Sequence, residues 1–189
     1  KIYFGNSLIA SIATEPIEND AEYSTKKLSD EEIKQDCESK AFLRLSQKLK
    51  KAYPRLPICI LADGLYVSEK VINRCKEYNW DYIIRYKEGS APSIAQEYNA
   101  IPEKTKTENA EFINGIIYKD GTVNVLKYTE TKVKKGKGIT TTFEWITSIE
   151  ITEKNAVKLA GAGRKRWKIE NQGFNRQKKW QGNIEHACS

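Results

Sequence analysis

The segment from Leu56 to Tyr86 limits the possible folds of this chain more than any other. Its first part, Leu56–Ala62, is a short continuous apolar run, which is typical of a strand buried on both faces of a sheet. Ser68 is suited to cap a helix that ends near Tyr78, and Trp80–Tyr86 has the composition of a second strand. Strand, helix and strand in this order predict two parallel strands joined by a right-handed crossover, the unit from which α/β folds are built.

Asp63 follows the first of these strands directly and precedes Gly64. The carboxyl ends of parallel strands are favoured places for active-site groups in open α/β sheets. An aspartate before a helix is also a frequent turn residue, and for Asp63 taken alone this is the commoner explanation. Asp63 is therefore a candidate site residue that needs a partner elsewhere in the chain.

The second unusual stretch is 163–178, where a single carboxylate, Glu170, lies among basic residues. On a helix, Arg166 lies one turn before Glu170, and the aromatic residues Trp167 and Phe174 form an apolar stripe beside it. A carboxylate next to an apolar stripe has either a structural partner or a chemical role. The two aromatic residues are more readily explained as core residues than as groups that stack on nucleic-acid bases.

Local signals predict the other elements. They are a hairpin around Gly5-Asn6, a helix from Ser29 to Lys50, strands on both sides of Asp120-Gly121, a strand over Ile139–Thr152 and a last helix over Ala156–Lys179. Residues 90–107 are mixed and polar and predict no regular element. The chain is thus predicted to be an α/β core over 1–90, a β-rich insertion over 91–150 and a C-terminal helix of the core over 151–189.

Charge favours an anionic partner. The net charge is +7, and nine lysines and arginines lie between Lys154 and Lys179. A basic run is often only a solvated face, so this signal is weak alone. The lysine-rich loop before Ile139 lacks the phosphate-binding G-x-x-x-x-G-K-[ST] motif and is interpreted as a hairpin turn.

Cysteine and apolar patterns exclude other classes of protein. No C-x-x-C occurs, and the single histidine, His186, is too little for a zinc site. The four cysteines are expected to be reduced, mostly buried thiols: Cys37, Cys59, Cys75 and Cys188. No apolar run approaches membrane-spanning length, so no membrane partner is expected. Since the sequence starts at Lys1 and contains no methionine, we expect a fragment.

In combination, these stretches resemble the DDE transposases of bacterial insertion sequences. The resemblance covers nearly the whole chain and is carried by residues 36–42, 57–66 and 164–175. It implies a ribonuclease H-like mixed sheet flanked by helices, with a β-rich insertion before the last helix. It also implies that Asp63 is the second catalytic acid and Glu170 the third, and that the first acid lies upstream of Lys1.

The helix signature of these transposases matches in part. Arg166 and Glu170 stand at its arginine and glutamate positions, while Gly163 replaces the tyrosine and Gln177 the lysine. Lys178 follows Gln177 directly. The resemblance implies DNA contacts from three basic residues of this helix: Arg164, Arg166 and Lys178.

The resemblance also implies the reaction and its partners. A phosphodiester is hydrolysed, and the new 3′-hydroxyl is joined to target DNA, with Mg²⁺ or Mn²⁺ held by Asp63 and Glu170. The partners are transposon ends and target DNA. We expect paired protomers in the active complex, and a cytoplasmic, nucleoid-associated location in bacteria.

Two other functions remain open from the sequence. The absent first acid and the altered tyrosine and lysine positions favour a second hypothesis, a non-catalytic DNA-binding remnant of a transposase. A ribonuclease H-like nuclease that acts in repair or on RNA would also use Asp63 and Glu170. Preference for terminal inverted repeats over random DNA distinguishes a transposase from such a nuclease.

Overall fold

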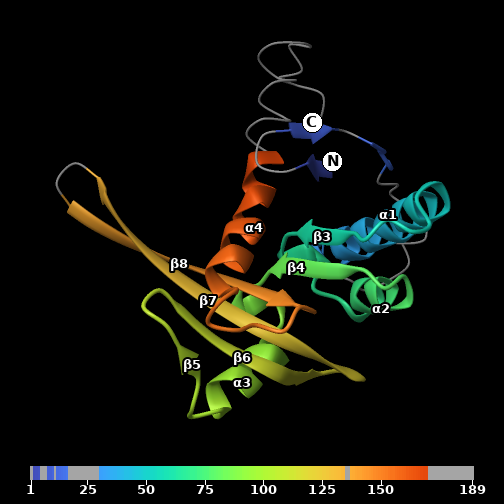
Figure 1. Cartoon of the computed structure of the whole chain (residues 1–189). Helices are drawn as coiled ribbons and strands as arrows, with labels where there is room; N and C mark the ends of the chain where they lie inside the picture. Colours follow the sequence, from blue (N-terminus) through green and yellow to red (C-terminus); the bar gives the residue numbers. More distant parts are fainter. Residues whose placement is uncertain (1, 5–7, 11, 17–29, 135–136, 170–189) are drawn as a thin grey trace.

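The computed structural model describes residues 2–4, 8–10, 12–16, 30–134 and 137–169 of the 189. The strands of its main sheet are β3 Cys59–Ala62, β4 Asp81–Arg85, β5 Thr105–Lys106, β6 Ala110–Tyr118, β7 Gly121–Lys134 and β8 Lys137–Thr147. They form one six-stranded sheet in the order β3-β4-β8-β7-β6-β5 (Figure 1). Strands β3 and β4 are parallel and all other neighbours are antiparallel, so the sheet is mixed.

Helices cover both faces of this sheet. They are α1 Asp30–Ala52, α2 Glu69–Glu77, α3 Pro92–Ala100 and α4 Ala156–Ile169, with short 3₁₀ turns η2 Gly64–Tyr66 and η3 Glu88–Ser90. Successive residues of β4 show the two layers, because Ile84 packs in a core with α1, α2 and α3, whereas Ile83 packs in a core with α4. This architecture confirms the predicted α/β class with a mixed, ribonuclease H-like sheet. None of the described helices is long and apolar enough to cross a membrane.

The predicted strand–helix–strand unit is present. Ser68 caps α2, and its Oγ accepts a hydrogen bond of 3.4 Å from the amide of Val71. Strands β3 and β4 pair in parallel from Cys59↔Asp81 to Ala62↔Ile84. The helix buries Val71 and Cys75, as its spacing predicts.

One expectation about β3 is wrong. The strand begins at Cys59 rather than Leu56, and Cys59 as a whole residue is exposed although the apolar run predicts burial on both faces. The reason is position, because β3 is an edge strand of the six-stranded sheet in the described part of the chain. The other two described cysteines, Cys37 and Cys75, are buried as expected.

Helix α3 lies where the sequence predicts no regular element. Pro92 occupies its first turn, where the missing amide hydrogen costs nothing. Three inward residues, Ile94, Ala95 and Tyr98, hold it on the sheet. A short helix needs only one such apolar row, and the polar residues between these three obscure the row in the sequence.

The strands of 110–147 continue the sheet of the strand–helix–strand unit, since β8 pairs with β4 on one side and with β7 on the other. Strands β7 and β8 pair as far as Lys134↔Lys137, whereas β6 pairs with β7 only to Tyr128. The two strands therefore leave the sheet as a long arm (Figure 1). Side-chain hydroxyls link its strands, as in the pair Thr129–Thr142 at 3.1 Å.

The N-terminal strands form a sheet of their own. Strands β1 Ile2–Phe4 and β2 Leu8–Ala10 pair antiparallel, which confirms the predicted hairpin.

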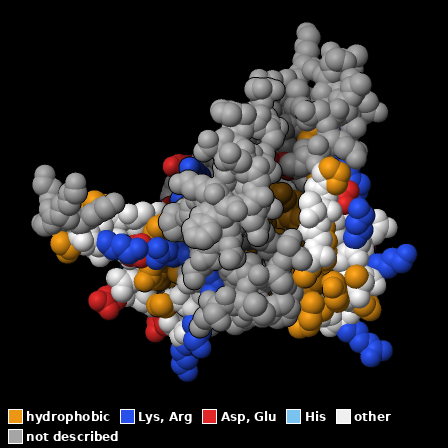
Figure 2. Space-filling model, turned by 90° about the horizontal axis from the view of Figure 1, so that it is seen from above, with side chains coloured by type: hydrophobic (Ala, Val, Ile, Leu, Met, Phe, Trp, Pro, Cys, Tyr) orange, Lys and Arg blue, Asp and Glu red, His pale blue; other side chains and the backbone are white. Residues whose placement is uncertain are grey.

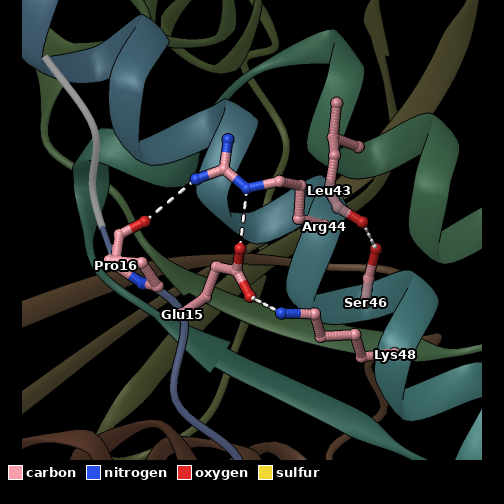
Figure 3. A network of polar contacts seen from close by, with 6 residues as sticks. All are labelled: Glu15, Pro16, Leu43, Arg44, Ser46 and Lys48. Carbon is pink, nitrogen blue, oxygen red and sulfur yellow. Dashed lines mark hydrogen bonds and ion pairs between the residues drawn. The ribbon is translucent and has the colours of Figure 1, made fainter.

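Residues 12–16 contact α1 through Glu15. Its carboxylate accepts hydrogen bonds from Lys48 Nζ at 2.6 Å and Arg44 Nε at 2.7 Å (Figure 3). These two cations, Lys48 first, lower the pKa of Glu15.

Candidate active site

Asp63 lies at the turn that follows β3. It is the N-cap of η2, where its Oδ1 accepts a hydrogen bond of 3.2 Å from the amide of Leu65, and its carbonyl accepts one of 3.1 Å from the amide of Tyr66. The capping role fits the explanation of Asp63 as a turn residue. The cap uses only one carboxylate oxygen, however, and the other oxygen, Oδ2, faces α4.

Arg166 of α4 meets that second oxygen. Its Nη1 atom lies 3.4 Å from Asp63 Oδ2, and the two side chains are 20% and 34% exposed. A long, partly solvated ion pair of this kind stabilises the fold by about 1 kcal/mol or less. Its importance is geometric, because it brings the basic part of α4 to the carboxyl end of β3.

Gly163 allows α4 to approach so closely. A Cβ atom at this position would lie 2.5 Å from Nε1 and 2.7 Å from Cε2 of Trp145 on β8. Trp145 is 2% exposed and stacks on Phe143 with ring centroids 5.9 Å apart, so it has little room to move. The resemblance assigns a tyrosine to position 163. In this structure Trp145 leaves no room for any side chain there, so the position requires glycine.

Two further arginines surround Phe143 on the same face of the sheet. The guanidinium carbons of Arg85 and Arg164 lie 5.6 Å and 4.9 Å from its ring centroid. Arg164 also pairs with Glu130 of the arm at 2.5 Å. In the described part of the chain Arg85 makes no ion pair, so the aromatic ring positions its charge without neutralising it.

Glu130 joins the arm to α4. Besides Arg164 it contacts Lys132 Nζ at 3.0 Å, and these two cations, Lys132 first, lower the pKa of its carboxyl. Arg164, a predicted DNA contact, is therefore already paired with a carboxylate in this structure.

On the face seen in Figure 2, described Lys and Arg side chains project at several separate places along the outline.

The structure brings together only some of the predicted site residues. Asp63 and Arg166 are in contact. Glu170 and Lys178 lie outside the described residues. So do Gly173, Phe174, Gln177, Trp180, His186, Cys188 and the side chain of Trp167.

Asp63 fits a hard divalent cation in part. It offers carboxylate oxygens, the ligand type that Mg²⁺ and Mn²⁺ prefer, and its side chain is partly open to solvent. Within the described ranges no group of three Asp, Glu, His or Cys side chains gathers around it or elsewhere. The remaining ligands of such a site would come from residues outside those ranges, among which is Glu170.

Sequence reasoning missed Arg85 and Glu130. A signal for Arg85 was present in the parallel pairing of β3 with β4. Ala62 pairs with Ile84, and the residues that follow these two are Asp63 and Arg85. If the parallel register continued by one residue, Arg85 would lie next to Asp63, which the sequence could have suggested. Glu130 had no local signal, because its contact depends on how α4 crosses the sheet.

Comparison with known families identifies the chain more directly. The family model described as "Transposase DDE domain" matches residues 35–184. This match includes Asp63, Arg166 and Glu170 and covers most of the chain. No curated protein matches.

Proposed function

Since the chain belongs to the family of transposase DDE domains, we propose that it cleaves DNA strands at the ends of an insertion sequence and joins them to target DNA, with Mg²⁺ or Mn²⁺ as cofactor. One observation carries this proposal, the contact between Asp63 at the end of β3 and Arg166 on α4. It joins the two elements on which the sequence predicts the catalytic acids.

Asp63 and Glu170 are the proposed catalytic residues and cation ligands. Glu170 follows Arg166 by four residues, and the predicted helix to Lys179 would carry it one turn further, about 6 Å along the axis. The side chains of Arg166 and Glu170 would then share one face of that helix. A residue on this face at position 166 already reaches Asp63, which supports a shared site for the two carboxylates.

Divalent cations held by Asp63 and Glu170 would help to activate the attacking oxygen and to stabilise the leaving oxygen of the phosphodiester. The negative charges of Asp63 and Glu170 would retain these cations at the end of β3. Arg166 balances the charge of Asp63 in the absence of cation and contacts a DNA phosphate in its presence, because a guanidinium binds carboxylate and phosphate with the same geometry.

Positive charge around this point supports DNA as substrate. Arg85, Arg164 and Arg166 lie on the face of the sheet that α4 covers, and all three approach either Asp63 or the ring of Phe143. We propose that they contact the phosphate backbone together with Lys178. Such contacts give sequence-independent affinity that falls with salt concentration.

The test is cleavage of a labelled duplex that carries the inverted repeats flanking the gene. Asp63→Asn and Glu170→Gln keep the size of each side chain and remove its charge. Each is expected to lower the rate of Mg²⁺-dependent cleavage by more than about 100-fold while DNA binding stays within a few-fold of wild type. Cleavage by either variant at the wild-type rate contradicts the proposed site.

The same experiment separates the alternatives. A complete protein that binds the repeats yet cleaves nothing with any divalent cation is a DNA-binding remnant. A protein that cleaves random duplex or RNA as fast as its own repeats is a nuclease of another kind.

A further inference from the structure

The arm of β7 and β8 projects from the body of the sheet (Figure 1). The pairing of β6 with β7 ends at Tyr128, and that of β4 with β8 ends at Trp145. In the described part of the chain the two strands then pair only with each other, over six residue pairs from Thr129↔Thr142 to Lys134↔Lys137. These pairs span about 17 Å. A two-stranded ribbon alone is marginally stable in water, so this arm is expected to have a partner.

One face of the arm is turned to α4. Glu130 contacts Arg164 of α4, and it also contacts Lys132, two residues further along the same strand. Residues two apart share a face of a strand, so Lys132 lies on this α4-side face, where its side chain is 65% exposed. Ile139, the cross-strand partner of Lys132, lies there too and is 49% exposed. The α4-side face therefore continues the face of the sheet on which the proposed site lies.

The opposite face of the arm is neutral. On this threonine face the hydroxyls pair across the strands, Thr129 with Thr142 at 3.1 Å and Thr131 with Thr140 at 3.0 Å. Val133 follows Thr131 on the same face and is 78% exposed. These residues satisfy one another and carry no charge that would attract a charged partner.

Charge indicates what the arm binds. Residues 129–142 hold a single acid, Glu130, and four lysines: Lys132, Lys134, Lys135 and Lys137. Glu130 is shared by two cations, so this group of three keeps a net charge of +1 on the α4-side face. Lysines beside a strand edge discourage pairing with a strand of another protein, whereas they attract a polyanion.

The dimensions of the arm suit duplex DNA. The major groove is about 12 Å wide and admits a two-stranded ribbon. Duplex DNA carries one negative charge per about 1.7 Å of its axis, so the 17 Å of the arm would run beside about ten of them.

We propose that duplex DNA lies along the α4-side face of the arm, with Lys132 at a phosphate, so that the arm extends the DNA-binding surface beyond the proposed site. The threonine face points away from this DNA. The inference rests on the proposed function, since it takes DNA as the partner and the face of Asp63 as the face that DNA covers.

The experiment measures the binding of a labelled duplex by the full chain, without divalent cation, over a series of salt concentrations. Ile139→Lys and Val133→Lys add the same charge at exposed aliphatic residues on opposite faces of the arm, so Val133→Lys is the matched control. Lys132→Gln removes a charge from the α4-side face. Urea unfolding checks that all three variants are folded.

The expected result is a difference between the two faces. Ile139→Lys should make the slope of log affinity against log salt steeper by about 0.9, the value for one more phosphate contact, which is about eightfold tighter binding at about 0.1 M salt. Lys132→Gln should make the slope less steep by a similar amount. Val133→Lys should leave it unchanged, a result that a general effect of net charge does not give.

Equal slopes in Ile139→Lys and Val133→Lys overturn the inference, as does a wild-type slope in Lys132→Gln. A steeper slope in Val133→Lys alone would put the DNA on the threonine face and also contradicts it.

Cleavage by Asp63→Asn distinguishes the two proposals. If Asp63→Asn abolishes cleavage while the three arm variants keep the wild-type slope, only the role of the arm is wrong. If Asp63→Asn cleaves like wild type while the slopes change as expected, the arm binds DNA and the proposed site is wrong.

Discussion

The guanidinium of Arg166 lies 3.4 Å from the carboxylate of Asp63, although the two residues are 103 positions apart in the sequence. This pair links the end of β3 to α4 across the face of the sheet. A divalent cation that binds Asp63 would meet the positive charge of Arg166 at the same oxygen. In the proposed site, Arg166 would therefore compete with the cation for Asp63 and would contact a DNA phosphate once the cation is bound.

Arg166→Ala tests this competition. We expect it to lower the DNA cleavage rate at least about tenfold, because a phosphate contact is lost, without weakening Mn²⁺ binding. The unfolding free energy should fall by about 0.2–1 kcal/mol, as for other partly exposed ion pairs. Single-turnover cleavage, Mn²⁺ titration and urea unfolding measure the three quantities. Weaker Mn²⁺ binding in Arg166→Ala would instead mean that the arginine supports the cation site.

Gly163→Ala tests the close approach of α4 to the sheet. The new methyl group would lie 2.5 Å from Trp145 Nε1, and overpacking of this kind costs about 1–3 kcal/mol, more than the helix gains from alanine. We expect a lower unfolding midpoint in urea. Gly161→Ala is the matched control in the same helix, since a Cβ there meets nothing within 4 Å, and it should raise stability by up to about 1 kcal/mol. Equal effects of the two substitutions would contradict the Trp145 contact.

Much of the architecture could be predicted because its signals are local. The apolar run before Asp63, the Ser68 cap and the second strand fix the parallel pair, and Asp120-Gly121 marks the β6–β7 turn to within one residue. Helix α3 was missed because its apolar row is short. Local signals also overstated the length and the burial of β3, because an apolar run fits an edge strand as well as a strand buried on both faces.

The site could be predicted only in part because it is assembled over long sequence separations. The sequence identified Asp63 and Arg166 separately, but their contact depends on how α4 lies across β3. The pairing of Arg164 with Glu130 depends in the same way on the length of the arm.

Glu130→Gln tests the connection between the arm and α4 through pH. Since the pKa of Glu130 is lowered in the folded protein, its ion pairs contribute stability above the ordinary carboxyl pKa of about 4.5. That contribution disappears as the pH falls through the lowered value. We expect wild type to lose more stability than Glu130→Gln between pH 5 and about pH 3. The measurement is the urea midpoint across this range, and Glu150→Gln, an exposed carboxylate before α4, should behave like wild type. Parallel pH profiles of wild type and Glu130→Gln would contradict the contact.

Arg85→Ala tests the proposed DNA surface. If Arg85 neutralises one phosphate, the slope of log affinity against log salt should become less steep by about 0.9, with binding weakened similarly on all duplex sequences. Arg55→Ala is the control. Arg55 is also an exposed arginine, but it precedes β3, whereas Asp63 follows the other end of that strand. Binding to short duplexes over a series of salt concentrations gives both slopes. An unchanged slope for Arg85→Ala would remove this residue from the interface.

Anomalous scattering from Mn²⁺ in crystals of the protein bound to DNA would show whether Asp63 and Glu170 bind the same divalent cation. We expect an ion at the end of β3 with oxygen atoms of both carboxylates at about 2 Å, as for small hard cations such as Mg²⁺. We also expect Arg166 to be turned from Asp63 towards a phosphate. An ion held by Asp63 with Glu170 on the opposite face of the sheet, or no ion at Asp63, would contradict the account.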